Sequence, residues 1–129
     1  MLPPPAFDFA PPSLMSQLVS IYFSCANPFL PVLHRPSFET ALREGRHEKD
    51  PRFGAVTMLM CAVASRWSVD PRVLPKESAE EDDPKAKWAS AGWNFYYQVF
   101  QRYRKSFSQS TSVYDLQMMA ASSGFFFIR

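Results

Sequence analysis

Residues 51–67 place the strongest constraint on how this chain can fold. Asp50 and Pro51 are typical of a helix start, because aspartate caps the first turn and proline is tolerated at the first helical position. The stretch that follows is apolar on nearly every side from residue 55 to residue 64. A helix without a polar face must be surrounded by other elements, so the sequence predicts an all-α fold with a central helix here. The expected core residues of this helix are Phe53, Val56, Leu59, Met60, Val63, Ala64 and Trp67.

Composition narrows the class of protein further. The chain has 129 residues, which corresponds to one domain or to part of one. Apolar residues make up 47% of it, while 12 prolines against 4 glycines disfavour a turn-rich β-barrel and a glycine-built phosphate loop. A net charge of +2 is too small to indicate a nucleic-acid surface. No signal peptide is visible, and the longest apolar run is too short to span a membrane, so we expect an intracellular, soluble interaction or regulatory module.

Four further helices are expected around the central one, which makes an irregular bundle of about five. Residues 1–12 form a proline-rich lead that we expect to be flexible, although Phe7 and Phe9 could dock onto the body, and residues 13–129 form the domain. Ser13 is the expected N-cap of the first helix, which Asn27 and Pro28 terminate. The second helix begins at residues 34–38 and stops at Gly45, and a charged loop follows over residues 46–50.

The second half of the chain holds the last two expected helices. Residues 68–84 form a connection with an acidic, solvated run, and Asp83 with Pro84 starts a continuous helix over residues 85–107. Its expected core face consists of Trp88, Gly92, Tyr96, Val99, Tyr103 and Phe107. A capping box at Ser112 predicts the last helix, whose expected core residues are Val113, Leu116, Met119 and Ala120. The apolar ending over residues 125–128 predicts either a partner or an incomplete larger helical domain, and with it self-association of the isolated chain.

The passage from the first helix into the second contains a set of closely spaced aromatic, proline and polar residues: Tyr22, Phe23, Asn27, Pro31, His34, Arg35, Pro36, Ser37 and Phe38. This passage resembles the opening of a known family, the fungal-specific transcription factor domain. This is the middle regulatory region of zinc binuclear cluster transcription factors, the xylanolytic-activator type among them. Further similarities follow in order: an alanine-rich helix, a variable loop, a Trp/Tyr-rich helix and a Ser-Val-Tyr-Asp-Leu-Gln passage at residues 112–117. We interpret the nine matching motif positions as structural.

The resemblance implies a regulatory or interaction segment of a fungal transcription factor, located in the nucleus. Family members carry zinc in a separate N-terminal cluster of six cysteines, which these residues lack, so we expect no cofactor here and DNA binding only indirectly. The resemblance implies an N-terminal portion of the regulatory domain. Its expected partners are the remainder of that domain or another protein, through apolar surface, and no membrane. The alternatives are a free-standing helical interaction adaptor or a truncated, non-functional relic.

The chemistry-bearing residues favour structure over catalysis. Cys25 and Cys61 lie far apart, show no paired metal-ligand spacing with His34 or His47, and are expected to be reduced and buried. We expect His34 to bond backbone groups, Arg35 to pair with an acid or carbonyl, and His47 to lie on the surface. No serine or cysteine nucleophile is arranged beside a histidine and an acid, so we predict that the chain is not an enzyme and has no metal site. The aromatic and basic residues around 96–105 are interpreted as core with a solvated edge rather than as a nucleic-acid surface.

Overall fold

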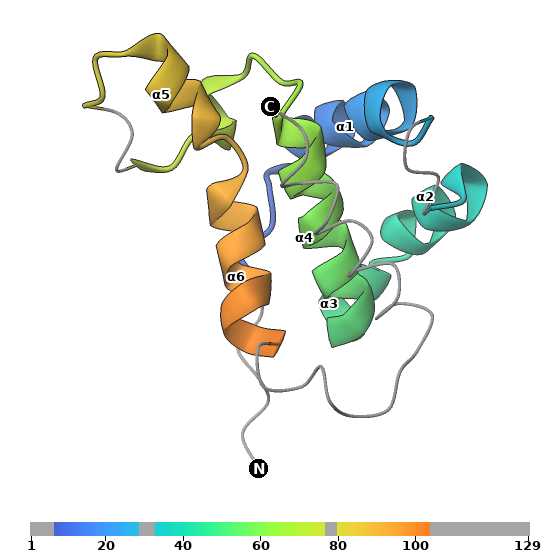
Figure 1. Cartoon of the computed structure of the whole chain (residues 1–129). Helices are drawn as coiled ribbons and strands as arrows, with labels where there is room; N and C mark the ends of the chain where they lie inside the picture. Colours follow the sequence, from blue (N-terminus) through green and yellow to red (C-terminus); the bar gives the residue numbers. More distant parts are fainter. Residues whose placement is uncertain (1–6, 29–32, 77–79, 104–129) are drawn as a thin grey trace.

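The described part of the chain is helical throughout its regular structure (Figure 1). A computed structural model describes residues 7–28, 33–76 and 80–103. These residues form α1 (Pro12–Ile21), α2 (Arg35–Arg43), α3 (Arg46–Lys49), α4 (Pro51–Ser65), α5 (Pro84–Ala89) and α6 (Trp93–Tyr103). A π-helical segment, Tyr22–Ala26, continues α1, and a 3-10 turn, Pro71–Val73, precedes α5. The prediction of an irregular all-α bundle is confirmed.

Helix α4 is the centre of the fold, as its sequence predicted. Every residue of α4 from Phe53 to Ser65 is buried. Helix α6 lies along one side of α4, whereas α1, the π-helical segment and α3 pack against it from other sides (Figure 1). Within α4 the two buried hydroxyls, Thr57 and Ser65, donate to the carbonyls of Phe53 and Cys61 one turn back, so the apolar environment holds no unpaired hydroxyl there.

The expected helix starts are confirmed where aspartate precedes proline. The Asp50 carboxylate accepts a hydrogen bond from the Arg52 amide at 3.0 Å, and Asp83 accepts one from the Lys85 amide at 3.1 Å. The first helix departs from this pattern. Pro11 occupies the N-cap position of α1, so Ser13 lies inside the first turn and is not the cap that we predicted. Proline has φ fixed near the helical value, so the consecutive residues Pro11 and Pro12 start the helix before Ser13.

Residues 46–50 were predicted as a charged loop, and this prediction is wrong for most of them. Gly45 ends α2 with φ of +74°, as predicted, and α3 then begins at once. The Glu48 amide donates to the Gly45 carbonyl, and the Asp50 amide donates to the Arg46 carbonyl at 2.7 Å. The left-handed glycine reverses the chain so tightly that the next residues close a helical turn of their own.

The predicted continuous helix over residues 85–107 is also wrong, because it is broken between α5 and α6. Gly92 has φ of +87°, and its amide donates to the Val73 carbonyl at 3.0 Å instead of to the previous helical turn. The break shifts the helical phase, so Ala91 and Phe95, which lie outside the predicted face, are buried. Of that face, Gly92 and Val99 are buried, and Trp88 and Tyr96 are partly buried.

Residues 80–83 of the acidic run are exposed, as expected. Several other predictions fall outside the described residues. They concern Pro31, Phe107, the helix expected from Ser112 and the apolar ending at residues 125–128.

Candidate functional site

The family motif folds into the junction between α1 and α2. Tyr22 is buried in the π-helical segment, and burial raises the pKa of its hydroxyl to about 12. Phe38 of α2 is 4% exposed, and its ring lies 6.0 Å from that of Phe23 and 5.4 Å from that of Phe53 in α4. Phe38 therefore ties α2 to both the first helix and the central helix, as predicted.

The polar residues of the motif stabilise the start of α2. His34 is the N-cap residue, and its Nδ1 forms a 2.8 Å hydrogen bond with the Ser37 hydroxyl. Arg35 pairs with Glu39 at 2.9 Å, one turn on, and its guanidinium lies over the Phe23 ring at 5.4 Å. The prediction for Arg35 is confirmed. The prediction for His34 is wrong, because its ring forms a hydrogen bond with a side chain of the same turn and not with a backbone group. The hydrogen bond of His34 and the ion pair of Arg35 are local and exposed, while the contact of Arg35 with Phe23 joins α2 to the π-helical segment. The described motif residues therefore support the fold.

His47 was predicted to lie on the surface, and the residue is partly exposed, although one side of its ring is covered. Its ring packs edge-on against Phe9, with ring centroids 4.8 Å apart, and its Nδ1 is buried with no hydrogen-bond partner among the described residues. Burial lowers the pKa of the imidazole, an effect that neighbouring Glu48 partly offsets. A histidine in this setting is neutral at physiological pH, because protonation would add an N–H that has no acceptor.

A groove of about 980 Å³ lies beside this histidine. Its apolar walls come from the lead and from α1 and α2, and its rim is polar. The apolar wall residues are Phe7, Phe9, Met15, Val19 and Leu42, and the charged or titratable rim residues are Glu39, Arg43, His47 and Glu48. The groove therefore has the mixture of apolar lining and few polar groups that small-molecule sites usually have.

The lead is held against the body from the opposite side. The Asp8 amide donates to Gln98 Oε1 of α6 at 2.8 Å, and Gln98 Nε2 donates to the Asp8 carbonyl at 3.4 Å. Phe7 is buried, and its ring lies 5.9 Å from that of Phe9. The docking of Phe7 and Phe9 is thus confirmed, and it depends on contacts between residues about 90 positions apart in the chain, which no local pattern reveals.

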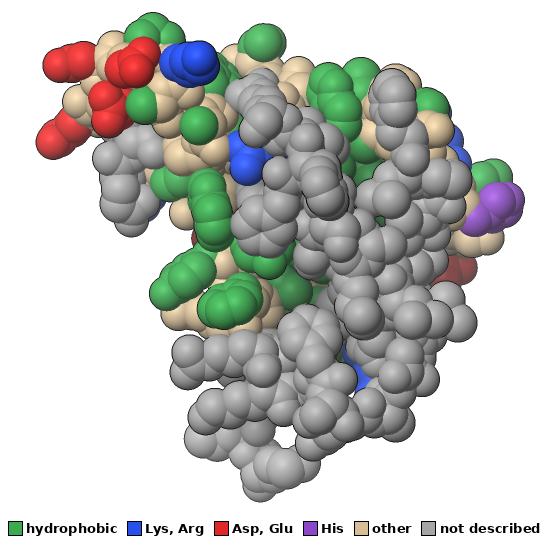
Figure 2. Space-filling view, viewed as in Figure 1, with side chains coloured by type: hydrophobic (Ala, Val, Ile, Leu, Met, Phe, Trp, Pro, Cys, Tyr) green, Lys and Arg blue, Asp and Glu red, His purple; other side chains and the backbone are tan. Residues whose placement is uncertain are grey.

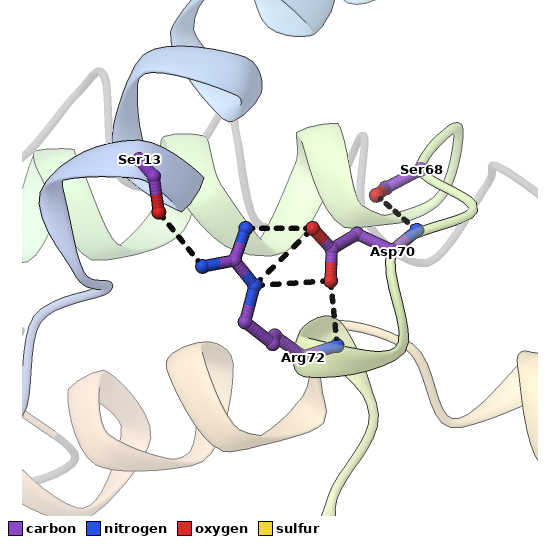
Figure 3. Close-up of polar contacts among 4 residues, drawn as sticks. All are labelled: Ser13, Ser68, Asp70 and Arg72. Carbon is purple, nitrogen blue, oxygen red and sulfur yellow. Dashed lines mark hydrogen bonds and ion pairs between the residues drawn. The ribbon is translucent and has the colours of Figure 1, made fainter.

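A polar cluster joins α1 to the 3-10 turn (Figure 3). The Asp70 carboxylate accepts from the Arg72 amide at 2.9 Å and from its guanidinium at 2.8–3.2 Å, while Arg72 donates to the Ser13 hydroxyl at 2.8 Å. The Ser68 hydroxyl accepts from the Asp70 amide. The hydrogen bonds from Arg72 hold the pKa of Asp70 below its usual range. Ser13 and Arg72 are exposed, Asp70 is partly buried and Ser68 is buried, and the charges of Asp70 and Arg72 compensate each other, so the role of the cluster is to fix the loop after α4.

Helix α6 presents an aromatic surface. Trp93, Tyr97 and Phe100 are 38%, 52% and 47% exposed, and Tyr96 packs between Trp93 and Phe100. We call Trp93, Tyr96, Tyr97 and Phe100 the aromatic patch; hydrophobic side chains gather in Figure 2 over the position that α6 occupies in Figure 1. The aromatic residues of this helix were interpreted as core with a solvated edge, and Tyr97 and Phe100 lie on the exposed edge. Exposed aromatic clusters are typical of protein-binding surfaces.

The described residues contain no group of three metal-ligating side chains. Both cysteines are free, but Cys25 is only partly buried, contrary to the prediction that both are buried. Cys61 is buried, its thiol donates to Met15 Sδ at 3.6 Å, and burial raises its pKa, so it is not a reactive thiolate.

In the part of the chain that the structure describes, no helix has the length and apolar character to cross a membrane.

Comparison with known proteins gives one family. The fungal specific transcription factor domain matches residues 19–123, which is most of the chain. No curated protein and no solved structure matches significantly. The chain therefore belongs to the family of fungal-specific transcription factor domains, as its sequence indicated, and this family has a regulatory role in fungal transcription factors.

Proposed function

We propose that this chain is a regulatory and interaction segment of a fungal transcription factor, and that it works in the nucleus by binding protein rather than by contacting DNA or catalysing a reaction. The observation that carries the proposal is the family match over residues 19–123. The transcription factors to which this family belongs are generally not enzymes. The exposed aromatic patch supports a binding role, because aromatic side chains contribute much of the energy of protein interfaces.

The charge of this surface favours a protein partner over DNA. Between the aromatics of α6 the exposed or partly exposed polar side chains are Asn94, Gln98 and Gln101, which are uncharged. Nucleic-acid binding requires cations that neutralise phosphates, and none of the α6 side chains that the structure describes is charged. The partner is a protein segment with an apolar face, either the remainder of the regulatory domain or a separate protein.

A tethered reporter assay tests the proposal. The full chain is fused to an unrelated DNA-binding domain in fungal cells, and the reporter output of the wild type is compared with that of a Tyr97→Ser/Phe100→Ser variant. The matched control is Asn94→Ser/Gln101→Ser, which changes polar exposed positions of the same helix. We expect the aromatic variant alone to alter reporter output and to lose co-purifying protein. Equal output from the wild type and both variants would contradict the proposal.

A second measurement concerns DNA and zinc. The purified chain is expected to retain no stoichiometric zinc after dialysis and to show no sequence preference for duplex DNA as salt approaches the physiological range. Specific DNA binding that survives physiological salt would show that the chain itself contacts DNA.

A third measurement concerns the partner. Addition of the remaining regulatory domain in trans, followed by light scattering, distinguishes an intramolecular partner from a separate protein.

A further inference from the structure

We infer that the groove between the lead, α1, α2 and α3 binds an uncharged, ring-containing small molecule that has one hydrogen-bond-accepting oxygen. This inference goes beyond the protein-binding role proposed above, and it is tested on the purified chain without reference to transcription. Three properties of the described residues carry it: the shape of the groove, the charges on its rim and the position of His47.

The shape of the groove suits a small molecule with several rings. Its volume of about 980 Å³ lies at the upper end of the range for small-molecule sites, which is roughly 300–1,000 Å³. The ring of Phe9 forms one wall, and Met15 and Val19 of α1 form another. The Gln98 contacts fix the backbone of the lead beside the first wall, so that wall is in place before a ligand arrives. A preformed apolar wall reduces the ordering cost of binding.

The charges on the rim select an uncharged ligand. Glu39 lines the groove but is already paired with Arg35 at 2.9 Å. The remaining charged groups on the rim are Arg43 and Glu48, which are opposite in sign and both exposed. The described residues of the rim thus have no net charge to compensate a carboxylate or an ammonium group, and transfer of a charged ligand from water into the apolar groove would be costly.

His47 supplies the polar contact. Its Nδ1 is buried without a partner among the described residues, so the remaining ring nitrogen, Nε2, is the hydrogen-bonding atom that the imidazole can offer to the groove. An unpaired buried acceptor is tolerated better than an unpaired buried donor, which favours the tautomer with the proton on Nε2. That nitrogen then donates, and the complementary group on the ligand is a carbonyl, ether or hydroxyl oxygen.

A set of pyrene derivatives tests these properties separately. The probes are 1-acetylpyrene, which is uncharged with one accepting oxygen, pyrene, which lacks the oxygen, and pyrene-1-carboxylate, which is an anion. The full chain is titrated into each probe, and fluorescence is recorded together with light scattering. We expect 1-acetylpyrene to bind to the non-aggregated chain more tightly than the other two.

Matched variants locate the site. Ser20→Trp fills the groove from an exposed position of α1, while Ser24→Trp makes the same substitution at an exposed position that does not line the groove. We expect the first to weaken 1-acetylpyrene binding on the order of tenfold and the second to leave it unchanged, with equal thermal stability. His47→Phe should keep pyrene binding and remove the preference for 1-acetylpyrene.

Several results would overturn the inference. Equal affinity of Ser20→Trp and Ser24→Trp would place the bound probe elsewhere, whether or not the His47 variant folds. Binding of pyrene-1-carboxylate as tightly as 1-acetylpyrene would refute the charge argument. Binding seen only where light scattering reports aggregates would mean that the groove of the folded chain binds nothing.

Discussion

Gly92→Ala is the substitution that examines the packing of this fold most directly. Gly92 lies where α5 gives way to α6, next to the last turns of α4. A Cβ built on Gly92 would lie 2.5 Å from the Ala62 carbonyl oxygen and 3.1 Å from both Ala62 Cα and Ser65 Cβ. Most of these atoms belong to backbone in the buried central helix, which cannot turn away as a flexible side chain can.

The expected cost has two parts. A non-glycine residue with φ near +87° pays about 1–2 kcal/mol for the left-handed conformation. Separating α6 from α4 to relieve the contact adds about 1–3 kcal/mol, the usual range for overpacking. The total of roughly 2–5 kcal/mol is a large part of a domain stability of about 5–15 kcal/mol.

Urea unfolding followed by circular dichroism measures this cost, and Gly45→Ala is the matched control. Gly45 also has a positive φ, of +74°, but a Cβ there would meet only the Glu48 carboxylate oxygen at 3.9 Å. Gly45→Ala should therefore pay the conformational part alone. Equal losses of stability for the two variants would refute the argument that α6 approaches the α4 backbone too closely for any side chain.

Three further predictions concern Phe38, His47 and Asp70. Phe38→Ala should lower the free energy of unfolding by about 3–5 kcal/mol, because the ring joins three helical segments; a loss below about 1 kcal/mol in denaturant melts would contradict this. The pKa of His47 is lowered from 6.5 by folding, so the unfolded chain binds more protons in mild acid. Its contribution to stability is complete above pH 6.5 and declines as the pH falls below that value, and thermal melts of His47→Gln should show a weaker decline than the wild type; identical pH profiles would disprove the assignment. Asp70→Ala should cost about 1 kcal/mol, the usual value of a lost helix cap, whereas Arg72→Ala should cost less because the pair is exposed. Urea melts that rank these two variants in the opposite order would assign the stabilisation to the Arg72–Ser13 contact.

Local chemistry explains what could be predicted from the sequence. Asp50–Pro51 and Asp83–Pro84 each start a helix by local contacts alone. In both cases the backbone amide that donates to the aspartate carboxylate lies only two residues further along the chain. The burial of α4 followed from the absence of a polar face. The role of Phe38 followed from its place in a family motif, and the family itself was identified from the same passage. None of these inferences needed knowledge of which helices are neighbours.

Features that depend on close approach between distant residues could not be predicted from local patterns. The break at Gly92 exists because α6 lies against the backbone of Ala62, and this break in turn decides that Phe95 is buried while Tyr97 and Phe100 are exposed. The pKa of His47 is lowered because its ring is partly buried, with Phe9, far away in the sequence, packed against it. The periodicity of a single helix specifies a face but not its neighbour. The central helix, the aspartate-capped helix starts and the family could therefore be predicted from the sequence, whereas packing determined the break at Gly92, the groove and the aromatic patch.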